Sequence, residues 1–217
     1  MNDMGRGRYV IVLVAAVLLA GCTAPETRKP DLEDLPRADT DVKQELIEAF
    51  NITQIGVNTT DIGTQTDTPY RRVISKHVKA SEKSIDAVMM QRRGIVESWS
   101  NVLTINNSNG TSDKPVPVLI ISTVRLYLDP KDAAARYNSI RRQARQNGGN
   151  VSSIMVNGTN VTRIRIQASK GQNNVMFLAN QKNLLYYASA VDEDRMFVDF
   201  ARRLFELMLE PAVNQRG

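Results

Sequence analysis

A tight turn in the second half of the chain limits the available folds more than any other sequence feature. The segment VSSIMVNGTNVTRIRI carries the pair Asn157-Gly158 between two alternating runs. Asn-Gly favours the positive φ angles of a type I′ turn, which joins neighbouring antiparallel strands. The segment NVMFLANQKNLLYYASA predicts a second hairpin around Asn180 to Asn183. Two consecutive hairpins indicate an antiparallel sheet.

Two amphipathic helices flank these hairpins. Asp129 and Pro130 predict the start of the first helix, as N-cap and first helical residue, and Gly148-Gly149 predicts its end. The second is expected from Asp192 to Leu209, with an acidic first turn that suits the positive end of the helix dipole. The apolar positions are Ala133, Tyr137, Ile140 and Ala144 in the first helix, and Phe197, Phe200, Ala201, Leu204 and Met208 in the second.

The region before the hairpins is less regular. GIVESWSNVLTI and VPVLIISTVRLYL predict two strands joined by a loop at Asn106 to Lys114. Asp41 to Phe50 predicts a short helix, and the segment from Asn51 to Pro69 is expected to be mostly irregular. Arg71 to Met90 is ambiguous, because YRRVISKHV alternates like a strand whereas ASEKSIDAVMMQRR favours a helix.

This order of elements predicts an α+β domain, an antiparallel sheet of hairpins with helices packed on one face. About 170 residues are enough for one such core. The predicted divisions are a signal peptide at 1–21, a Pro-rich tether at 22–39, a helical and irregular part of the domain at 40–92, the α+β core at 93–210 and a tail at 211–217.

The element order from Arg93 to Leu209 resembles the PsbP-like fold. The similarity lies in the order of elements predicted for NNVMFLANQKNLLYYASAVDEDRMFVDFARRLF, a last hairpin followed by a long helix. The resemblance implies a non-enzymatic role in binding partners or assisting assembly.

The N-terminus has the pattern of a signal peptide. Arg6 and Arg8 precede an apolar run from Tyr9 to Ala20, which is shorter than the roughly 20 residues that a spanning helix needs. Small residues then lead to Cys22, the only cysteine in the chain. Thr23 to Asp39 contains three prolines among charges of both signs, which predicts a disordered tether.

Leu19-Ala20-Gly21-Cys22 resembles the lipobox of prokaryotic lipoproteins. The resemblance implies that a diacylglyceryl group, with acyl chains such as palmitate, is attached to the Cys22 thiol and that the chain is cleaved just before it. It also implies an anchor at the extracytoplasmic face of the cell membrane, or of the outer membrane in a two-membrane bacterium, since Thr23 rather than Asp follows the cysteine. An ordinary cleaved signal and an uncleaved anchor stay as alternatives.

N-x-S/T triplets are abundant, which is a second indication of an extracytoplasmic protein. Asn and Thr also populate turns and strand edges for conformational reasons, so composition alone is the alternative explanation. The triplets predict N-glycosylation only in a cell that carries out that modification. They begin at Asn51, Asn58, Asn106, Asn109, Asn150, Asn157 and Asn160.

The side chains present in the sequence give little support to an enzymatic activity. His77 is the only histidine, so neither a zinc site nor a Ser/His/Asp site is expected, and no phosphate-binding loop occurs. We expect no cofactor and no metal. The acidic cluster Asp192 to Asp194 is interpreted as helix-start charge, and Asp31, Glu33 and Asp34 as a solvated linker. A carboxylate-based hydrolase is the weakest alternative.

The most concentrated basic set lies on the first predicted helix. The chain has a net charge of +5, which is too diffuse to indicate nucleic-acid binding. The set is either a patch for anionic headgroups, an envelope polymer or an acidic protein, or simply a solvated helix face. It comprises Arg136, Arg141, Arg142 and Arg145, with Arg163 and Arg165 on a later strand.

Four aromatic residues on predicted strands are either ordinary core residues or the lining of a pocket, which would make the protein a small-ligand carrier. They are Trp99, Tyr127, Tyr186 and Tyr187. The sequence thus favours a lipid-anchored extracytoplasmic module that binds or assembles envelope components.

Overall fold

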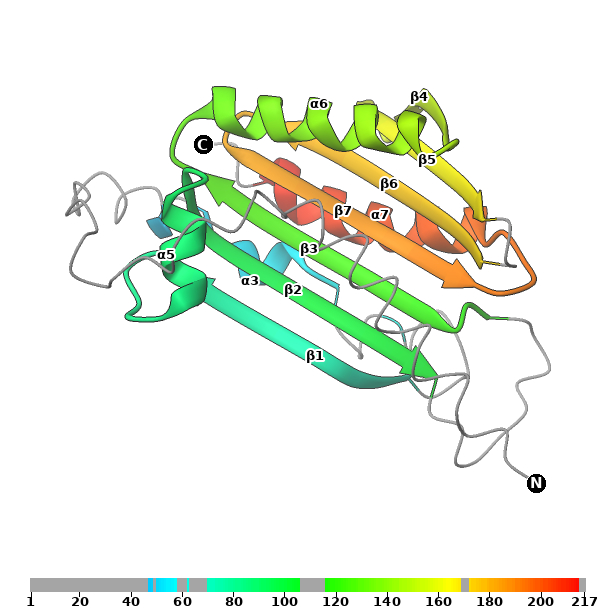
Figure 1. Ribbon diagram of the computed structural model, residues 1–217, viewed down its shortest axis with the longest axis horizontal. Coiled ribbons are helices and arrows are strands. Elements are labelled where there is room, and N and C mark those ends of the chain that lie inside the picture. The colour runs from blue at the N-terminus through cyan, green and yellow to red at the C-terminus, as the bar shows by residue number, and fades with distance from the viewer. Residues whose placement is uncertain are drawn as a thin grey trace. The chain divides into compact units, whose positions relative to one another are not determined.

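The computed structural model describes residues 47–48, 50–57, 62, 70–105, 116–168 and 172–214. Their framework is a seven-stranded sheet of order β1-β2-β3-β7-β6-β5-β4 (Figure 1), in which every neighbouring pair is antiparallel. The strands are β1 (Tyr70–Lys79), β2 (Ile95–Ile105), β3 (Leu119–Tyr127), β4 (Asn150–Val156), β5 (Thr159–Ala168), β6 (Gln172–Gln181) and β7 (Leu184–Asp192). The helices are α3 (Ile52–Ile55), α5 (Ile85–Gln91), α6 (Pro130–Gln146) and α7 (Val198–Asn214).

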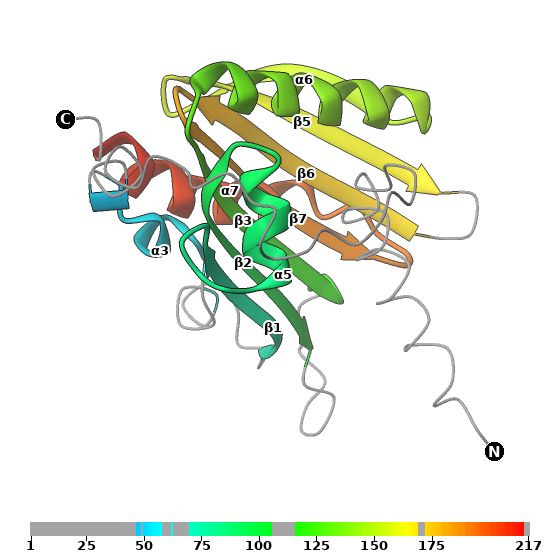
Figure 2. The same cartoon turned by 60° about the vertical axis from the view of Figure 1, so that its left-hand side comes forward.

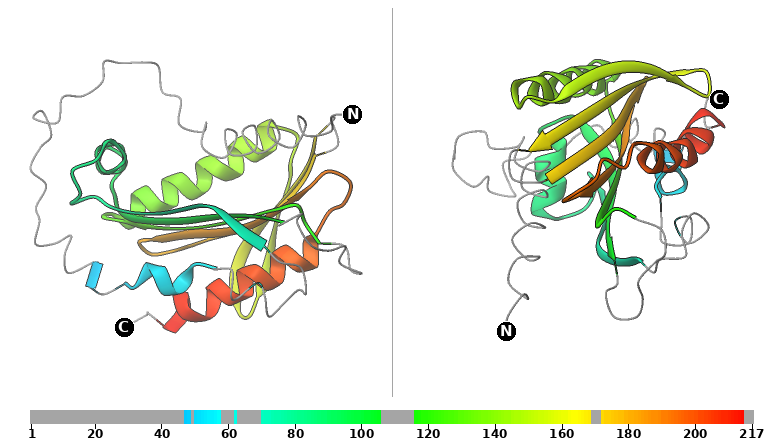
Figure 3. Two further views of the ribbon diagram at one scale, coloured as in Figure 1. Left: turned by 90° about the horizontal axis from the view of Figure 1, so that it is seen from below. Right: turned by 90° about the vertical axis from the view of Figure 1, so that its right-hand side faces the viewer.

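Helices cover both faces of this sheet. Figures 2 and 3 show α5 and α6 on one face, which we call the α6 face, and α3 and α7 on the other, the α7 face. The α+β class and the antiparallel sheet are confirmed, but the prediction that the helices pack on one face is wrong. The reason lies in the two central strands. β3 and β7 are buried on both sides along almost their whole length, so a single layer of helices would leave apolar surface in water.

The α7 face carries the main apolar core. Phe205 of α7 stacks on Tyr186 of β7 with ring centroids 5.4 Å apart, and its centroid lies 6.2 Å from that of Phe177 on β6. All three side chains are fully buried. Trp99 of β2 fills the space beside Gly56, where a Cβ would lie 1.8 Å from the indole ring. A glycine is therefore needed at this close approach.

Both ends of α6 agree with the sequence prediction. The Asp129 side chain accepts a hydrogen bond from the backbone N–H of Lys131 at 2.7 Å, and Pro130 occupies the first turn. Ala133 and Ala144 are buried against the sheet. Gly148, at φ +75°, follows the C-cap.

Both predicted hairpins are confirmed. Asn157 and Gly158 have φ angles of 47° and 76°, as a type I′ turn requires, and Val156 pairs with Thr159 beside them. The turn between β6 and β7 is docked on the end of β3, because the Asn183 side-chain amide donates to the carbonyl oxygens of Tyr127 and Leu128.

The ambiguous segment before Gly94 combines both predicted structures, a strand followed by a helix. β1 pairs with β2 and so belongs to the sheet, although 40–92 was expected to be helical or irregular. Ser84 caps α5 by accepting from the N–H of Ala87. In the segment expected to be mostly irregular, Ile52–Ile55 forms the short helix α3.

The last helix begins later than predicted. Asp192 still pairs with Asn173 as the end of β7, and its side chain accepts from the N–H groups of Asp194 and Arg195. These bonds form a turn before α7 starts at Val198. The helix then continues to Asn214, so part of the predicted tail is helical.

Candidate binding surface

The four predicted arginines of α6 do not form one patch. Arg136 and Arg145 are nine residues apart, about two and a half helical turns, and therefore lie on opposite sides of the helix. Arg136 is close enough to Tyr127 of β3 for its charge to act on the phenol. The remaining group of Arg141, Arg142 and Arg145, which we call the outward cluster, has two exposed members, Arg142 and Arg145, and one half-buried member, Arg141.

This outward cluster has no acidic partner in the described part of the chain. Arg142 and Arg145 are exposed, and none of the three arginines forms an ion pair with a described carboxylate. The Arg141 guanidinium lies over the Tyr137 ring, 5.2 Å from its centroid, and the Tyr137 hydroxyl is 2.5 Å from the Thr162 hydroxyl of β5. The stacked contact holds Arg141 against the helix surface.

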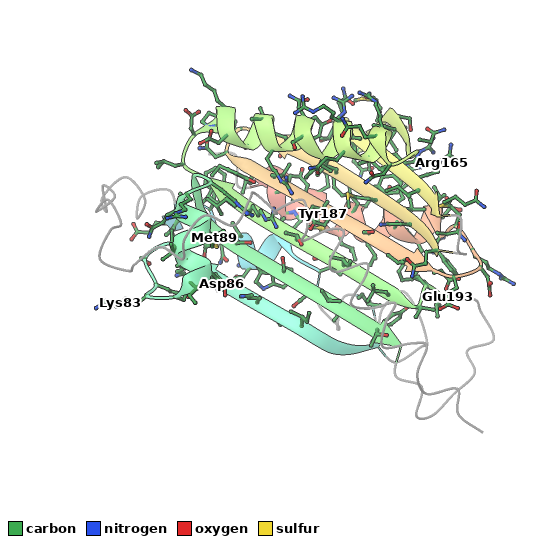
Figure 4. All side chains as sticks on the ribbon, viewed as in Figure 1. Lys83, Asp86, Met89, Arg165, Tyr187 and Glu193 are labelled. Atoms are coloured by element: carbon green, nitrogen blue, oxygen red, sulfur yellow. The ribbon has the colours of Figure 1, made fainter. Side chains whose placement is uncertain are left out.

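Arg163 and Arg165 do not extend the cluster. Arg163 pairs directly with Phe177 of the α7-face core, whereas Thr162 contacts α6, so Arg163 lies on the α7 face. Its Nε donates to the Ser152 hydroxyl at 3.2 Å. Arg165, two residues further on, shares that face and is labelled in Figure 4.

A second polar group, which the sequence reasoning missed, lies on the α6 face. Arg125 hydrogen-bonds the Tyr127 hydroxyl, and Arg136 approaches it from α6. Burial raises the pKa of Tyr127 above its usual value, and the two positive charges offset part of that rise. The alternation Arg125-Leu126-Tyr127 was the available signal, since residues two apart on a strand share a face.

Of the predicted carboxylate cluster Asp192 to Asp194, Asp192 has a structural role in the described residues. Asp192 holds the turn before α7, as described above, whereas Glu193 and Asp194 are exposed. No described set of three or more His, Cys, Asp or Glu side chains is arranged to hold a metal ion. Asp31, Glu33, Asp34 and Cys22 lie outside the described residues.

His77 pairs with a buried carboxylate. Its Nε2 lies 2.6 Å from Oε1 of Glu97, whose side chain is 5 % exposed, while the imidazole is 36 % exposed. The ring is thus partly at the surface and also satisfies Glu97. Such a pair explains how Glu97 is tolerated on the apolar face.

The four strand aromatics do not line one shared pocket. Tyr186 and Tyr187 point to opposite faces because they are adjacent on β7, and Figure 4 shows Tyr187 on the face that carries α5 and α6. Trp99 and Tyr186 belong to the α7-face core, and Tyr127 lies on the α6 face. The core interpretation fits Trp99 and Tyr186, and the division between the two faces excludes one pocket lined by all four side chains.

Four of the seven N-x-S/T asparagines fall in described residues, and all four are exposed: Asn51, Asn150, Asn157 and Asn160. The last three belong to the β4–β5 hairpin. Asn58, Asn106 and Asn109 lie outside the described residues.

Comparison with known proteins gives no family. No family model matches the sequence, and no curated protein matches it. Among solved structures, the chain is similar to the extracellular domain of PknH from Mycobacterium tuberculosis, with a TM-score of 0.48 and 8% identity over 76% of this chain and 95% of that domain. The resemblances to the lipobox and to the PsbP-like fold stay predictions.

Proposed function

We propose that this protein is an extracytoplasmic lipoprotein, anchored through Cys22, whose domain is a non-enzymatic module that binds an anionic surface of the cell envelope through Arg141, Arg142 and Arg145. The observation that carries the binding role is this outward cluster, which has no described acidic partner. Neighbouring cations on one helix face add their fields and attract anionic surfaces.

The anchor rests on the order of charge, apolar core and small residues before Cys22. None of the described helices has the length and apolar character needed to cross a bilayer. Two acyl chains hold a protein on a membrane where one chain is marginal. Exchanging Cys22→Ala should abolish labelling by radioactive palmitate and leave the precursor uncleaved. Undiminished labelling of that variant would exclude the assignment.

Three of the described carboxylates have structural contacts, which fits a binding role. Glu97 pairs with His77, Asp129 caps α6 and Asp192 holds a turn.

The binding role is tested with vesicles of phosphatidylglycerol and phosphatidylcholine. We expect Arg142→Glu combined with Arg145→Glu to lower the affinity for these vesicles at least tenfold at low salt, since each reversal replaces attraction by repulsion. Lys83→Glu with Arg203→Glu is the matched control, because both residues are exposed and the change in net charge is the same. Lys83 lies beside α5, at the other edge of the sheet from Arg165 (Figure 4). Equal losses in the two variants would show a diffuse charge effect and refute the site.

Glycosylation is a further part of the proposal. Asn150, Asn157 and Asn160 lie exposed on one hairpin, where an oligosaccharyltransferase would reach them. Intact-mass measurement of protein from its native cells checks this, and an unmodified mass would contradict it.

A further inference from the structure

The free edge of β4 lacks the devices that usually prevent strands from pairing across molecules. β4 ends the sheet, and no described strand lies beyond it. Its sequence, NVSSIMV, contains no charge and no proline, and its pairing with β5 has no register shift. Charged residues, prolines and bulges are the common protections of an edge.

The other edge shows these protections. β1 has a register shift between Arg72 and Ile74 and carries Lys76 and Lys79. Lys76 is also paired with Asp86 of α5. The absence of such features on β4 is therefore a property of this edge and not of the whole sheet.

The hairpin geometry fixes which backbone groups of β4 point outward. In a two-residue hairpin the residues beside the turn, here Val156 and Thr159, exchange both hydrogen bonds. The bonded positions then alternate along the strand. Val151, Ser153 and Met155 consequently direct their N–H and C=O groups away from β5, toward the open edge.

The outward backbone groups of Val151, Ser153 and Met155 are complementary to the same groups of a second copy. When two β4 strands run antiparallel about a two-fold axis at Ser153, Ser153 faces its own copy and Val151 faces Met155 of the second copy. This register brings every outward group opposite another outward group, and each pair can exchange two hydrogen bonds. It also covers Met155, a large apolar side chain that is 63% exposed.

We propose that two copies of this chain associate through β4 in this register and join their sheets into one continuous sheet. The strand is neutral, so pairing brings no like charges directly opposite each other within it. The two-fold axis is perpendicular to the joined sheet, so α6 of both copies lies on the same side. The dimer presents two outward arginine clusters to one anionic surface, which would strengthen binding by avidity. The pairing itself does not depend on what α6 binds.

Cysteine crosslinking tests the register. The full chain is purified in detergent with Cys22→Ser, so that an introduced cysteine is the only thiol. Ser153→Cys should form a covalent dimer under mild oxidation, because facing bonded residues have Cα atoms about 5.5 Å apart, within disulfide range. Ser152→Cys is the control. Its Cα would be roughly 8 Å from its copy, which is too far for a disulfide. Equal crosslinking at both positions, or none at Ser153, would overturn the proposal.

A charge exchange tests the same contact without a covalent bond. Ser153 is exposed, so Ser153→Lys and Ser153→Glu should both fold, as circular dichroism can verify. Each alone places like charges opposite each other and should be monomeric by light scattering at concentrations where the parent chain is dimeric. An equimolar mixture should regain the dimer mass. A monomeric parent chain, or dimers in either single variant, would contradict pairing through β4.

Discussion

The two faces of the sheet are stabilised by different interactions. On the α7 face, Phe205, Tyr186 and Phe177 are fully buried and pack ring against ring. On the α6 face, α6 contacts the sheet through small residues and a hydroxyl pair, Tyr137 with Thr162, and presents arginines to solvent. One face therefore holds the aromatic core, while the other combines buried aliphatic side chains such as Leu178 and Ile164 with exposed charge on its helix.

Under the proposed function, this difference separates stability from recognition within one small domain. Substitutions on the outer side of α6 are expected to change few buried contacts, whereas substitutions on the α7 face disturb the core. The comparison predicts unequal costs for substitutions on the two faces.

The largest effect is expected from Phe205→Ala. Removing this ring leaves a cavity between Tyr186 and Phe177, and we expect the free energy of unfolding to fall by about 3–5 kcal/mol. Ile140→Ala on α6, where the side chain is half-buried, should cost about 1 kcal/mol. Urea unfolding measures both, and similar losses would abolish the distinction between the faces.

Gly56→Ala should also destabilise the α7 face. The added Cβ would lie 1.8 Å from the Trp99 ring, so the indole or the backbone must shift, at a cost of about 2 kcal/mol. The double variant with Trp99→Ala tests the cause, since the clash then disappears. If Gly56→Ala costs the same in both backgrounds, the contact with Trp99 is not responsible.

Tyr137→Phe examines the hydroxyl pair of the α6 face. Thr162 is fully buried, so loss of its partner should cost about 1–2 kcal/mol in the free energy of unfolding. Adding Thr162→Val removes the second hydroxyl and should recover part of that loss. A thermal-melt comparison of the single and double variants is sufficient, and further destabilisation by Thr162→Val would argue against the pair.

The smallest effect is expected from alkaline titration of Tyr127. Burial raises the pKa of Tyr127 in the folded state, so its contribution to stability is complete below the unfolded value of about 10 and is lost as pH rises toward the folded value. Tyr127→Phe should make the fall in the free energy of unfolding above pH ~10 shallower, by up to about 1.4 kcal/mol per pH unit.

Burial and the charge of Asp192 also raise the pKa of Tyr70, which lies in the α7-face core without a cation offsetting the rise. The effect of Tyr70→Phe on the pH dependence of stability should therefore persist to higher pH than that of Tyr127→Phe. If the Tyr127→Phe effect persisted to the higher pH instead, the role of Arg125 and Arg136 would be contradicted.

Some elements were predictable because their signals are local. Asn157-Gly158 fixed a hairpin, and Asp129-Pro130 fixed the start of α6, through interactions that span only a few residues. The spacing of Arg136 and Arg145 already placed them on opposite sides of the helix, although they were first grouped together. In β7 the uncharged run LLYYASAV likewise indicated a strand that is buried on both sides.

The sequence by itself determined the hairpins, the limits of α6 and the antiparallel α+β class, because turn and cap geometry depend on neighbouring residues. Only the tertiary structure decided how the helices divide between the two faces, which arginines lack an acidic partner among the described residues, and that Asp192 ends a strand instead of starting α7. These outcomes depend on contacts between residues far apart in the chain, whose energies local patterns do not encode.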